Sequence, residues 1–131
     1  MTATSNPNRS QCKFENSIPI LNVKNIADSL NYYTKVLGFQ IDWEWEDPPT
    51  FASVSRDSVC LFFCQEGQGH SGTWISIFVD NVDELYREYQ AKGAVIRQEP
   101  IDYPWGTREI NIEDPDGHRL RICMETCIEA Q

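Results

Sequence analysis

The sequence has 131 residues, and its 20 Asp and Glu outnumber 11 Lys and Arg to give a formal net charge of −9. This length predicts one domain with its own core, and no apolar run approaches the roughly 20 residues of a membrane-spanning helix. The negative charge argues against a nucleic-acid partner and favours a cationic ligand, although an acidic surplus also serves solubility alone. Because the chain starts with a polar segment and lacks an apolar signal sequence, we expect a soluble, cytoplasmic protein with no membrane partner.

The five cysteines do not form a zinc motif. Cys60 and Cys64, like Cys123 and Cys127, are four residues apart in segments that predict strands. That spacing is about 13 Å along a strand, too far for the two thiols to share one metal ion or one disulfide. We therefore expect reduced and mostly buried thiols.

The sequence predicts the same series of elements twice. Each half begins with an apolar strand and continues with a helix, for which Asn25 and Asn81 are suitable N-caps. Gly38 and Gly93 are typical of the residue that ends such a helix. The expected strands and helices, in chain order, are 18–23, 25–38, 39–45 and 55–63, then 74–79, 81–93, 94–97 and 113–122.

The repeated unit has the order βαβββ. Residues 55–63 and 113–122 each predict two strands joined by a tight turn, and Asp57 aligns with Asp116. One such unit is too small to bury both faces of its sheet, so the two units should share a core in an α+β domain. The Gly-rich segment 66–72 is the expected boundary between them. The boundaries that follow are 1–12 for a flexible N-terminal tail, 13–125 for a single domain, about 14–65 and 73–125 for its modules, and 126–131 for a C-terminal tail.

Two segments carry a resemblance to a known family: NIADSLNYYTKVLGF in the first helix region and EDPDGHRL near the end of the chain. In this order and spacing they resemble the vicinal-oxygen-chelate superfamily, which includes glyoxalase I, extradiol dioxygenases, and fosfomycin- and bleomycin-resistance proteins. The resemblance covers residues 14–125. It implies a glyoxalase/bleomycin-resistance-like fold in which two βαβββ modules form a curved mixed sheet.

The metalloenzymes of this superfamily bind a divalent ion through His, Gln or Glu on the first and last strands of each module. The resemblance places those positions at Ile18, Trp74 and Arg121, and the strand segment VCLFF of the first module has no carboxylate. His118 follows the DPDG turn, where a solvent-facing hairpin residue is the favoured interpretation. We therefore expect no metal ligands, no cofactor and no catalytic residues.

Two longer segments, PILNVKNIADSLNYYTKVLGFQIDW and PWGTREINIEDPDGHRLRI, are similar to the bleomycin-resistance branch of the superfamily. Proteins of that branch are non-catalytic, acidic dimers that sequester bleomycin, a cationic glycopeptide drug, in grooves between subunits. The resemblance implies that Trp105 and Phe51, from different subunits, stack on the drug's flat bithiazole tail. We therefore expect a homodimeric, metal-independent binding protein that confers antibiotic resistance by lowering the free drug concentration.

The other aromatic residues leave alternatives open. Trp43 and Trp45 alternate with acidic residues and share one face of a strand, which suits either the ligand or the core. Strand positions favour the core for Phe62, Phe63 and Phe78.

The two arginines near the end of the chain also have two interpretations. Arg108 and Arg121 suit either structural ion pairs, for example with Glu109, or an anionic group of a ligand, and the ion pairs are favoured. The full set of expected ligand-binding residues is Trp43, Trp45, Glu46, Asp47, Phe51, Phe63, Trp74, Tyr103, Trp105 and Arg108.

Two other functions stay open. The stretch from Trp43 to Thr50 is longer than in bleomycin-resistance proteins and lies beside the expected pocket, which allows a binding module or sensor for another small molecule. The third hypothesis is an enzyme of the superfamily with an atypical metal site.

Overall fold

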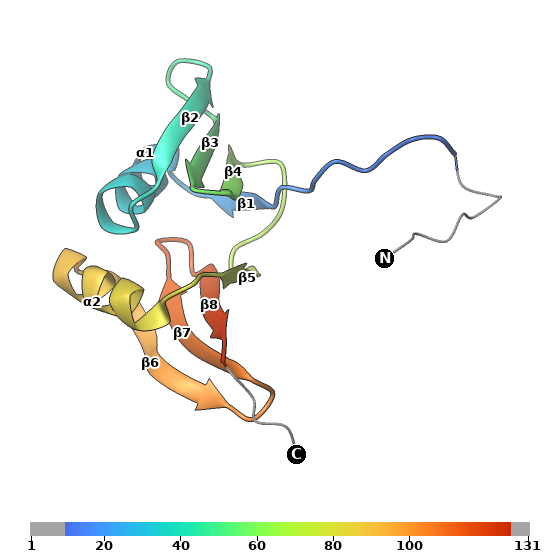
Figure 1. Cartoon of the computed structure of the whole chain (residues 1–131). Coiled ribbons are helices and arrows are strands. Elements are labelled where there is room, and N and C mark those ends of the chain that lie inside the picture. The colour runs from blue at the N-terminus through green and yellow to red at the C-terminus, as the bar shows by residue number, and fades with distance from the viewer. Residues whose placement is uncertain (1–9, 127–131) are drawn as a thin grey trace.

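The computed structural model describes residues 10–126, which form two modules of similar design (Figure 1). The elements of module one are β1 (Ile20–Val23), α1 (Ile26–Asn31), the π-helical turn η1 (Tyr32–Val36), β2 (Gln40–Trp45), β3 (Phe51–Arg56) and β4 (Val59–Gln65). Those of module two are β5 (Trp74–Phe78), α2 (Val82–Lys92), β6 (Val95–Tyr103), β7 (Thr107–Glu113) and β8 (Arg119–Glu125). Most of each expected tail, and Cys127, lie outside the described residues.

Each module has one four-stranded mixed sheet, and the two sheets have the same topology. The strand order is β1-β4-β3-β2 in module one and β5-β8-β7-β6 in module two. The first and last strands of each module pair in parallel, and the other neighbours pair antiparallel. The α+β class and the repeated βαβββ order are therefore confirmed, with the strands hydrogen-bonded as two open sheets.

Both helices begin at the asparagines that the sequence indicates. The Asn25 side chain accepts a hydrogen bond from the Asp28 backbone N–H, and Asn81 caps α2 through Glu84 in the same way. The long α2 ends at Gly93, whose φ of 80° is the left-handed conformation that glycine adopts without strain.

The first helix differs from its expected form because it continues as the π-helical turn η1. Two neighbouring tyrosines of this turn contact module two. Tyr32 donates a hydrogen bond to the Glu113 carbonyl at 2.8 Å, and Tyr33 donates one to the Asp114 carboxylate at 2.7 Å. Burial raises the pKa of Asp114 and places that of Tyr33 well above its usual value.

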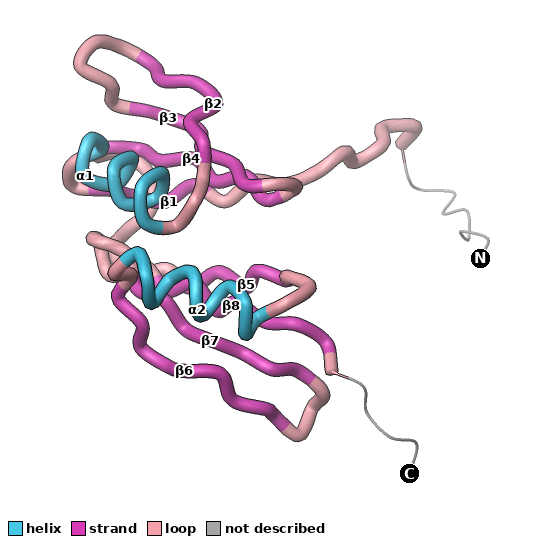
Figure 2. Tube along the Cα trace, turned by 60° about the vertical axis from the view of Figure 1, so that its left-hand side comes forward, coloured by secondary structure: helices cyan, strands magenta, loops and turns pink. Residues whose placement is uncertain are grey.

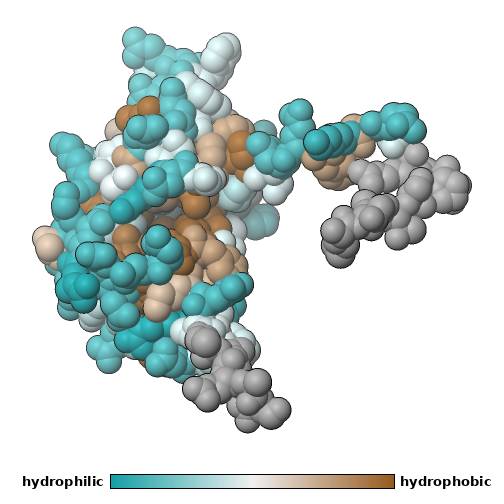
Figure 3. Space-filling view, in the orientation of Figure 1, coloured by the Kyte–Doolittle hydropathy of each residue, from teal (hydrophilic) through white to brown (hydrophobic). Residues whose placement is uncertain are grey.

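Both helices lie on the same side of the molecule and cover one face of each sheet, as Figures 1 and 2 show together. The covered faces share one core that runs through both modules, with Leu21, Tyr33 and Phe63 on one side and Ile110 and Ile112 on the other. The opposite faces are open. Figure 3 looks at the side of the molecule, where apolar residues gather between the two modules and hydrophilic residues surround them.

The hairpin that joins β7 to β8 closes one side of the junction between the modules. Asp116 accepts a hydrogen bond from the Lys24 backbone N–H at 2.9 Å. His118 is fully buried, with Nε2 2.7 Å from the Asn22 carbonyl oxygen and Nδ1 accepting from the Thr73 N–H at 2.9 Å. The expectation of a solvent-facing His118 was therefore wrong, because module one covers the hairpin.

The cysteines and the lengths of the helices bear on two further expectations. The thiols of Cys64 and Cys123 are buried and that of Cys60 is partly so, whereas Cys12 is exposed; all four are free. Within residues 10–126, no helix has both the length and the apolar character needed to cross a membrane.

Candidate ligand-binding faces

The open face of module one carries a cluster of aromatic rings. Trp43 stacks on Phe51 with ring centroids 5.7 Å apart and planes 9° from parallel. Phe62 meets Trp43 edge-on at 5.2 Å and Phe51 at 5.6 Å. The rings meet because Trp43 and Phe62 both pair with Ser53 from opposite sides of β3, beyond a register shift in β2. We call Trp43, Trp45, Phe51 and Phe62 the first aromatic face.

A hollow of about 490 Å³ opens beside this cluster, at the end of the β2–β3 hairpin. It brings together four of the expected site residues, Trp43, Trp45, Glu46 and Phe51, and Glu66 adds a second carboxylate at its rim. The carboxylate of Glu46 accepts a hydrogen bond from Thr50, which joins the two ends of the β2–β3 loop. The hollow can therefore offer flat apolar surface beside negative charge.

The open face of module two is built around Trp105. Its ring stacks on Tyr103 with centroids 4.5 Å apart and planes 13° from parallel, and its indole N–H donates to Glu109 at 3.3 Å. The Arg121 guanidinium lies 6.0 Å from the ring centroid. We call Trp74, Phe78, Tyr103 and Trp105 the second aromatic face. Tyr103 and Arg121 therefore both contact the Trp105 ring, which is nevertheless 58% exposed.

Glu109 anchors this arrangement. Its side chain is only 4% exposed and accepts two hydrogen bonds from Arg121, at 2.7 and 2.9 Å. These bonds, with smaller contributions from Thr107 and Trp105, lower the pKa of Glu109 to about 2 although burial opposes them. The ion-pair interpretation of Arg121 is therefore confirmed, and its charge is not free for an anionic ligand.

Trp74 lies on the open face, 61% exposed, with the Arg119 guanidinium 5.5 Å from its ring centroid. Asp47 lies exposed in the β2–β3 loop. Phe63, by contrast, is fully buried and packs on Tyr33 at 4.8 Å, so it does not reach the first aromatic face. Of the expected ligand-binding residues, Phe63 therefore belongs to the core.

Arg108 also points away from the open faces. It donates to both oxygens of Asp83 on the covering helix α2, at 2.9–3.1 Å, and pairs with Asp102 at 3.1 Å. This is the structural ion pair that the sequence favoured, and it holds the Arg108 side chain beside α2.

Two residues expected in the core lie on the open faces instead. Phe78 is 62% exposed, and Phe62 is only partly buried beside Trp43. The period-two alternation of a strand places Phe78 on the same face as Trp74, and Phe62 on the opposite face from Leu61 and Phe63. Which of the two faces is buried depends on where the helix packs.

The positions that the sequence resemblance gives for metal ligands carry no suitable donors. Arg121 is committed to Glu109, Trp74 offers only its ring, and Ile18 precedes β1. Among residues 10–126, no three His, Cys, Asp or Glu side chains lie close enough together to bind a metal ion. These residues do not fit a divalent ion at the family's usual position.

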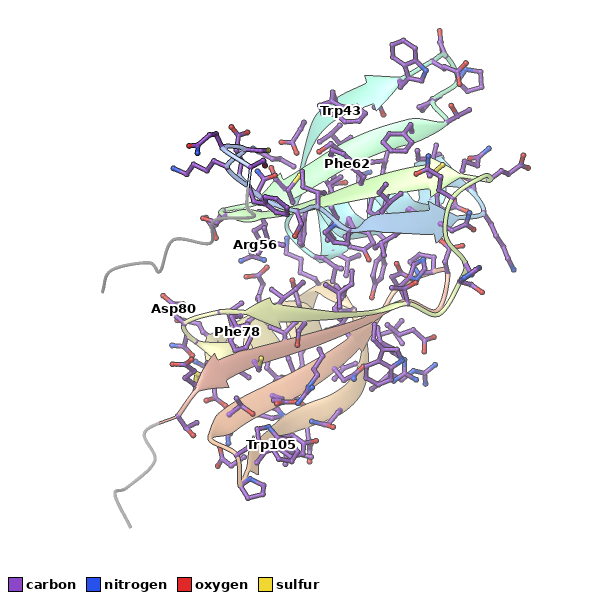
Figure 4. All side chains as sticks on the ribbon, turned by 90° about the vertical axis from the view of Figure 1, so that its right-hand side faces the viewer. Trp43, Arg56, Phe62, Phe78, Asp80 and Trp105 are labelled. Carbon is purple, nitrogen blue, oxygen red and sulfur yellow. The ribbon has the colours of Figure 1, made fainter. Side chains whose placement is uncertain are left out.

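The two aromatic faces lie on different sheets of one chain. Figure 4 shows Trp43 and Phe62 on the upper module and Trp105 at the far end of the lower one. Phe51, stacked on Trp43, is thus remote from Trp105.

This arrangement of two βαβββ modules agrees with the comparison against protein families. The model of the Glyoxalase/Bleomycin resistance protein/Dioxygenase superfamily matches residues 16–122. The chain belongs to this superfamily. No curated protein sequence matches the chain.

Solved structures with the same fold include both binding proteins and enzymes, as their names state. A bleomycin resistance determinant encoded on the transposon Tn5 is 22% identical, with a TM-score of 0.74 over 87% of this chain and 100% of that chain. A bleomycin-binding protein complexed with bleomycin is also 22% identical, with a TM-score of 0.72 over 86% and 99%. A lactoylglutathione lyase from Agrobacterium tumefaciens is 13% identical, with a TM-score of 0.71 over 86% and 95%. At these identities the likenesses show the fold.

Proposed function

We propose that this superfamily member is a non-catalytic binding protein that sequesters a flat, cationic, aromatic compound of the bleomycin type on its aromatic faces. Binding lowers the free concentration of the compound and so confers resistance to it. The function requires no metal ion and no covalent chemistry.

The observation that carries this proposal is the exposure of all four tryptophans. Trp43, Trp45, Trp74 and Trp105 are 42%, 65%, 61% and 58% exposed. Tryptophan is usually well buried, and groups of exposed aromatic residues mark surfaces that bind ligands or other subunits. The net charge of −9 and the carboxylates of Glu46 and Glu66 favour a positively charged ligand.

A homodimer is part of the proposal. Phe51 and Trp105 lie on different sheets of one chain, so one flat group can contact both only if the rings come from two subunits. Pairing the first aromatic face of one subunit with the second face of its partner would also cover the exposed tryptophans. Each dimer would then have two equivalent sites.

The test is a titration of bleomycin into the metal-free protein, followed by tryptophan fluorescence. We expect saturable quenching near one ligand per chain. In Trp105→Ala the affinity should fall about two- to twelvefold, because a stacked aromatic pair contributes about 0.5–1.5 kcal/mol. The Arg108→Lys variant is a control, since Arg108 contacts α2 and should leave binding unchanged.

A flat titration would contradict bleomycin as the ligand. The second candidate function is then binding of a different aromatic cation, which the hollow beside Glu46 and Thr50 favours. A thermal-shift screen would identify such a ligand by the rise in melting temperature that binding to the native state causes.

A further inference from the structure

A second cavity lies at the junction of the two modules, and Phe78 is the one residue of the aromatic faces that lines it. It has a volume of about 630 Å³, within the range of small-molecule pockets. Its apolar floor comes from both modules and includes Phe39, Ile77, Leu85, Tyr89, Leu120 and Ile122, beside Phe78. Figure 3 shows apolar residues gathered in this region of the surface, between the modules.

The groove exists because the two modules do not cover each other equally. The β7–β8 connection, residues 114–118, packs into the junction and bonds to module one through Asp116 and His118. The corresponding β3–β4 connection is only the two-residue turn Asp57–Ser58. This short turn lines the groove beside Asp80 without filling it. The β7–β8 connection therefore fills the junction on one side of the molecule, whereas the shorter β3–β4 turn leaves the corresponding space on the other side open.

The rim of the groove is negatively charged. Glu88 also lines it, but both its oxygens are bonded to Arg56, at 2.9 and 3.0 Å. The remaining carboxylates at the rim are Asp57, Asp80 and Glu84. None of these three takes part in an ion pair with another residue between 10 and 126. Figure 4 shows Arg56 pointing from module one toward β5, with Phe78 and Asp80 below it.

We infer that this groove is a second binding site, which takes an organic ammonium ion with an apolar body. The apolar part packs on the floor between the modules, and the cationic group lies among Asp57, Asp80 and Glu84. Charge complementarity selects a cation over a neutral or anionic molecule of the same length. The groove borders the second aromatic face at Phe78 but contains none of the four tryptophans, so the inference does not depend on the function proposed for the aromatic faces.

The probe is octyltrimethylammonium, added to the full-length ¹⁵N-labelled protein and followed by amide NMR shifts. We expect saturable shifts at Ser58, Asp80 and Leu85, while the Trp105 indole N–H signal stays in place. Octanoate, which has a similar chain and the opposite charge, should cause no shift at the groove.

The matched variants separate the groove from general charge effects. Asp80→Asn with Glu84→Gln should weaken binding of the probe about fivefold, since each exposed charge contributes little by itself. The control is Asp28→Asn with Glu99→Gln. It removes the same charge, and Asp28 has the same capping position on α1 as Glu84 on α2. The control should keep the affinity within about twofold.

Equal affinity in the two double variants would overturn the proposal. So would groove shifts with octanoate, absence of saturable groove shifts with the probe, or shifts confined to the aromatic faces. A bleomycin titration of Asp80→Asn with Glu84→Gln separates the two sites. The bleomycin affinity of this double variant should equal that of the unmodified protein, whether or not the probe binds to the groove.

Discussion

At the scale of single residues, Glu109 makes a prediction about acid stability. Its pKa is about 2 in the folded protein, below the ordinary value of 4.5. The stability that it contributes is therefore present above pH 4.5 and is lost as the pH falls toward 2. Because Arg121 is 42% exposed and screened by water, we expect a contribution of about 1–2 kcal/mol to the free energy of unfolding at neutral pH.

Urea unfolding of Glu109→Gln at a series of pH values measures this contribution. The variant should be less stable than the unmodified protein at pH 7, and the difference should shrink below pH 4.5. The Glu99→Gln variant changes an exposed residue of β6 and should show no such convergence. A difference at Glu109 that stays constant down to pH 3 would mean that the ion pair does not stabilise the fold.

Single residues also show what the sequence could indicate about the site. The resemblance pointed to Trp105 and Phe51, and both lie on open faces. It could not show that Phe63 faces the core while Phe62 does not, since the choice depends on which strand face the helix covers. The partner of Arg108, Asp83, comes from α2, and such contacts between distant segments have no local sequence signal.

At the scale of elements, the helix caps make a second prediction. Asn25 and Asn81 each accept a hydrogen bond from a backbone N–H in the first turn of a helix, at Asp28 and Glu84. Asn25→Ala and Asn81→Ala should each lower the free energy of unfolding by about 1 kcal/mol, measured by urea denaturation. Asn31→Ala is the control, because its side chain makes no capping bond. An equal loss in the free energy of unfolding at all three positions would show that it comes from the Asn→Ala change itself and not from the lost capping bond.

Element boundaries were predictable where a local pattern fixed them. Both helix starts and the repeated strand order could be predicted, because capping and strand alternation depend on only a few neighbouring residues. Strand β6 continues to Tyr103, well beyond the expected residue 97, and includes Pro100. A proline predicts the end of a strand, but β6 is at the edge of its sheet, where the missing N–H is tolerated. Whether a strand lies at the edge depends on the order of all strands in the sheet, so the local sequence around Pro100 could not predict where β6 ends.

At the scale of the whole molecule, His118 joins the modules. It contacts the Asn22 carbonyl in module one and the Thr73 N–H at the start of module two. His118→Leu would remove the hydrogen-bond partner of both part-buried groups, at a cost of about 2–4 kcal/mol in the free energy of unfolding. Chemical denaturation measures the loss, and His70→Leu, at an exposed position, should cost much less. A comparable loss in both variants would contradict this role of His118.

The proposed dimer makes a sharper prediction about the binding sites. Phe51→Ala and Trp105→Ala should each weaken both sites of their own homodimers. When the two variants are refolded together, mixed dimers combine the intact Phe51 of one chain with the intact Trp105 of the other. These dimers should regain one tight bleomycin site, measured by calorimetry. No recovery in dimers shown to be mixed would place both rings of a site on one chain.

The hairpin between β7 and β8 also has a consequence for synthesis of the protein on the ribosome. Module one is made first, yet the groups that complete it, at Asp114, Asp116 and His118, are near the end of the chain. A nascent chain that ends in the segment 66–72 would therefore leave the Asn22 carbonyl and the Tyr33 hydroxyl without these partners. Although the two modules look like independent repeats, the first reaches its final form only after the second has been translated.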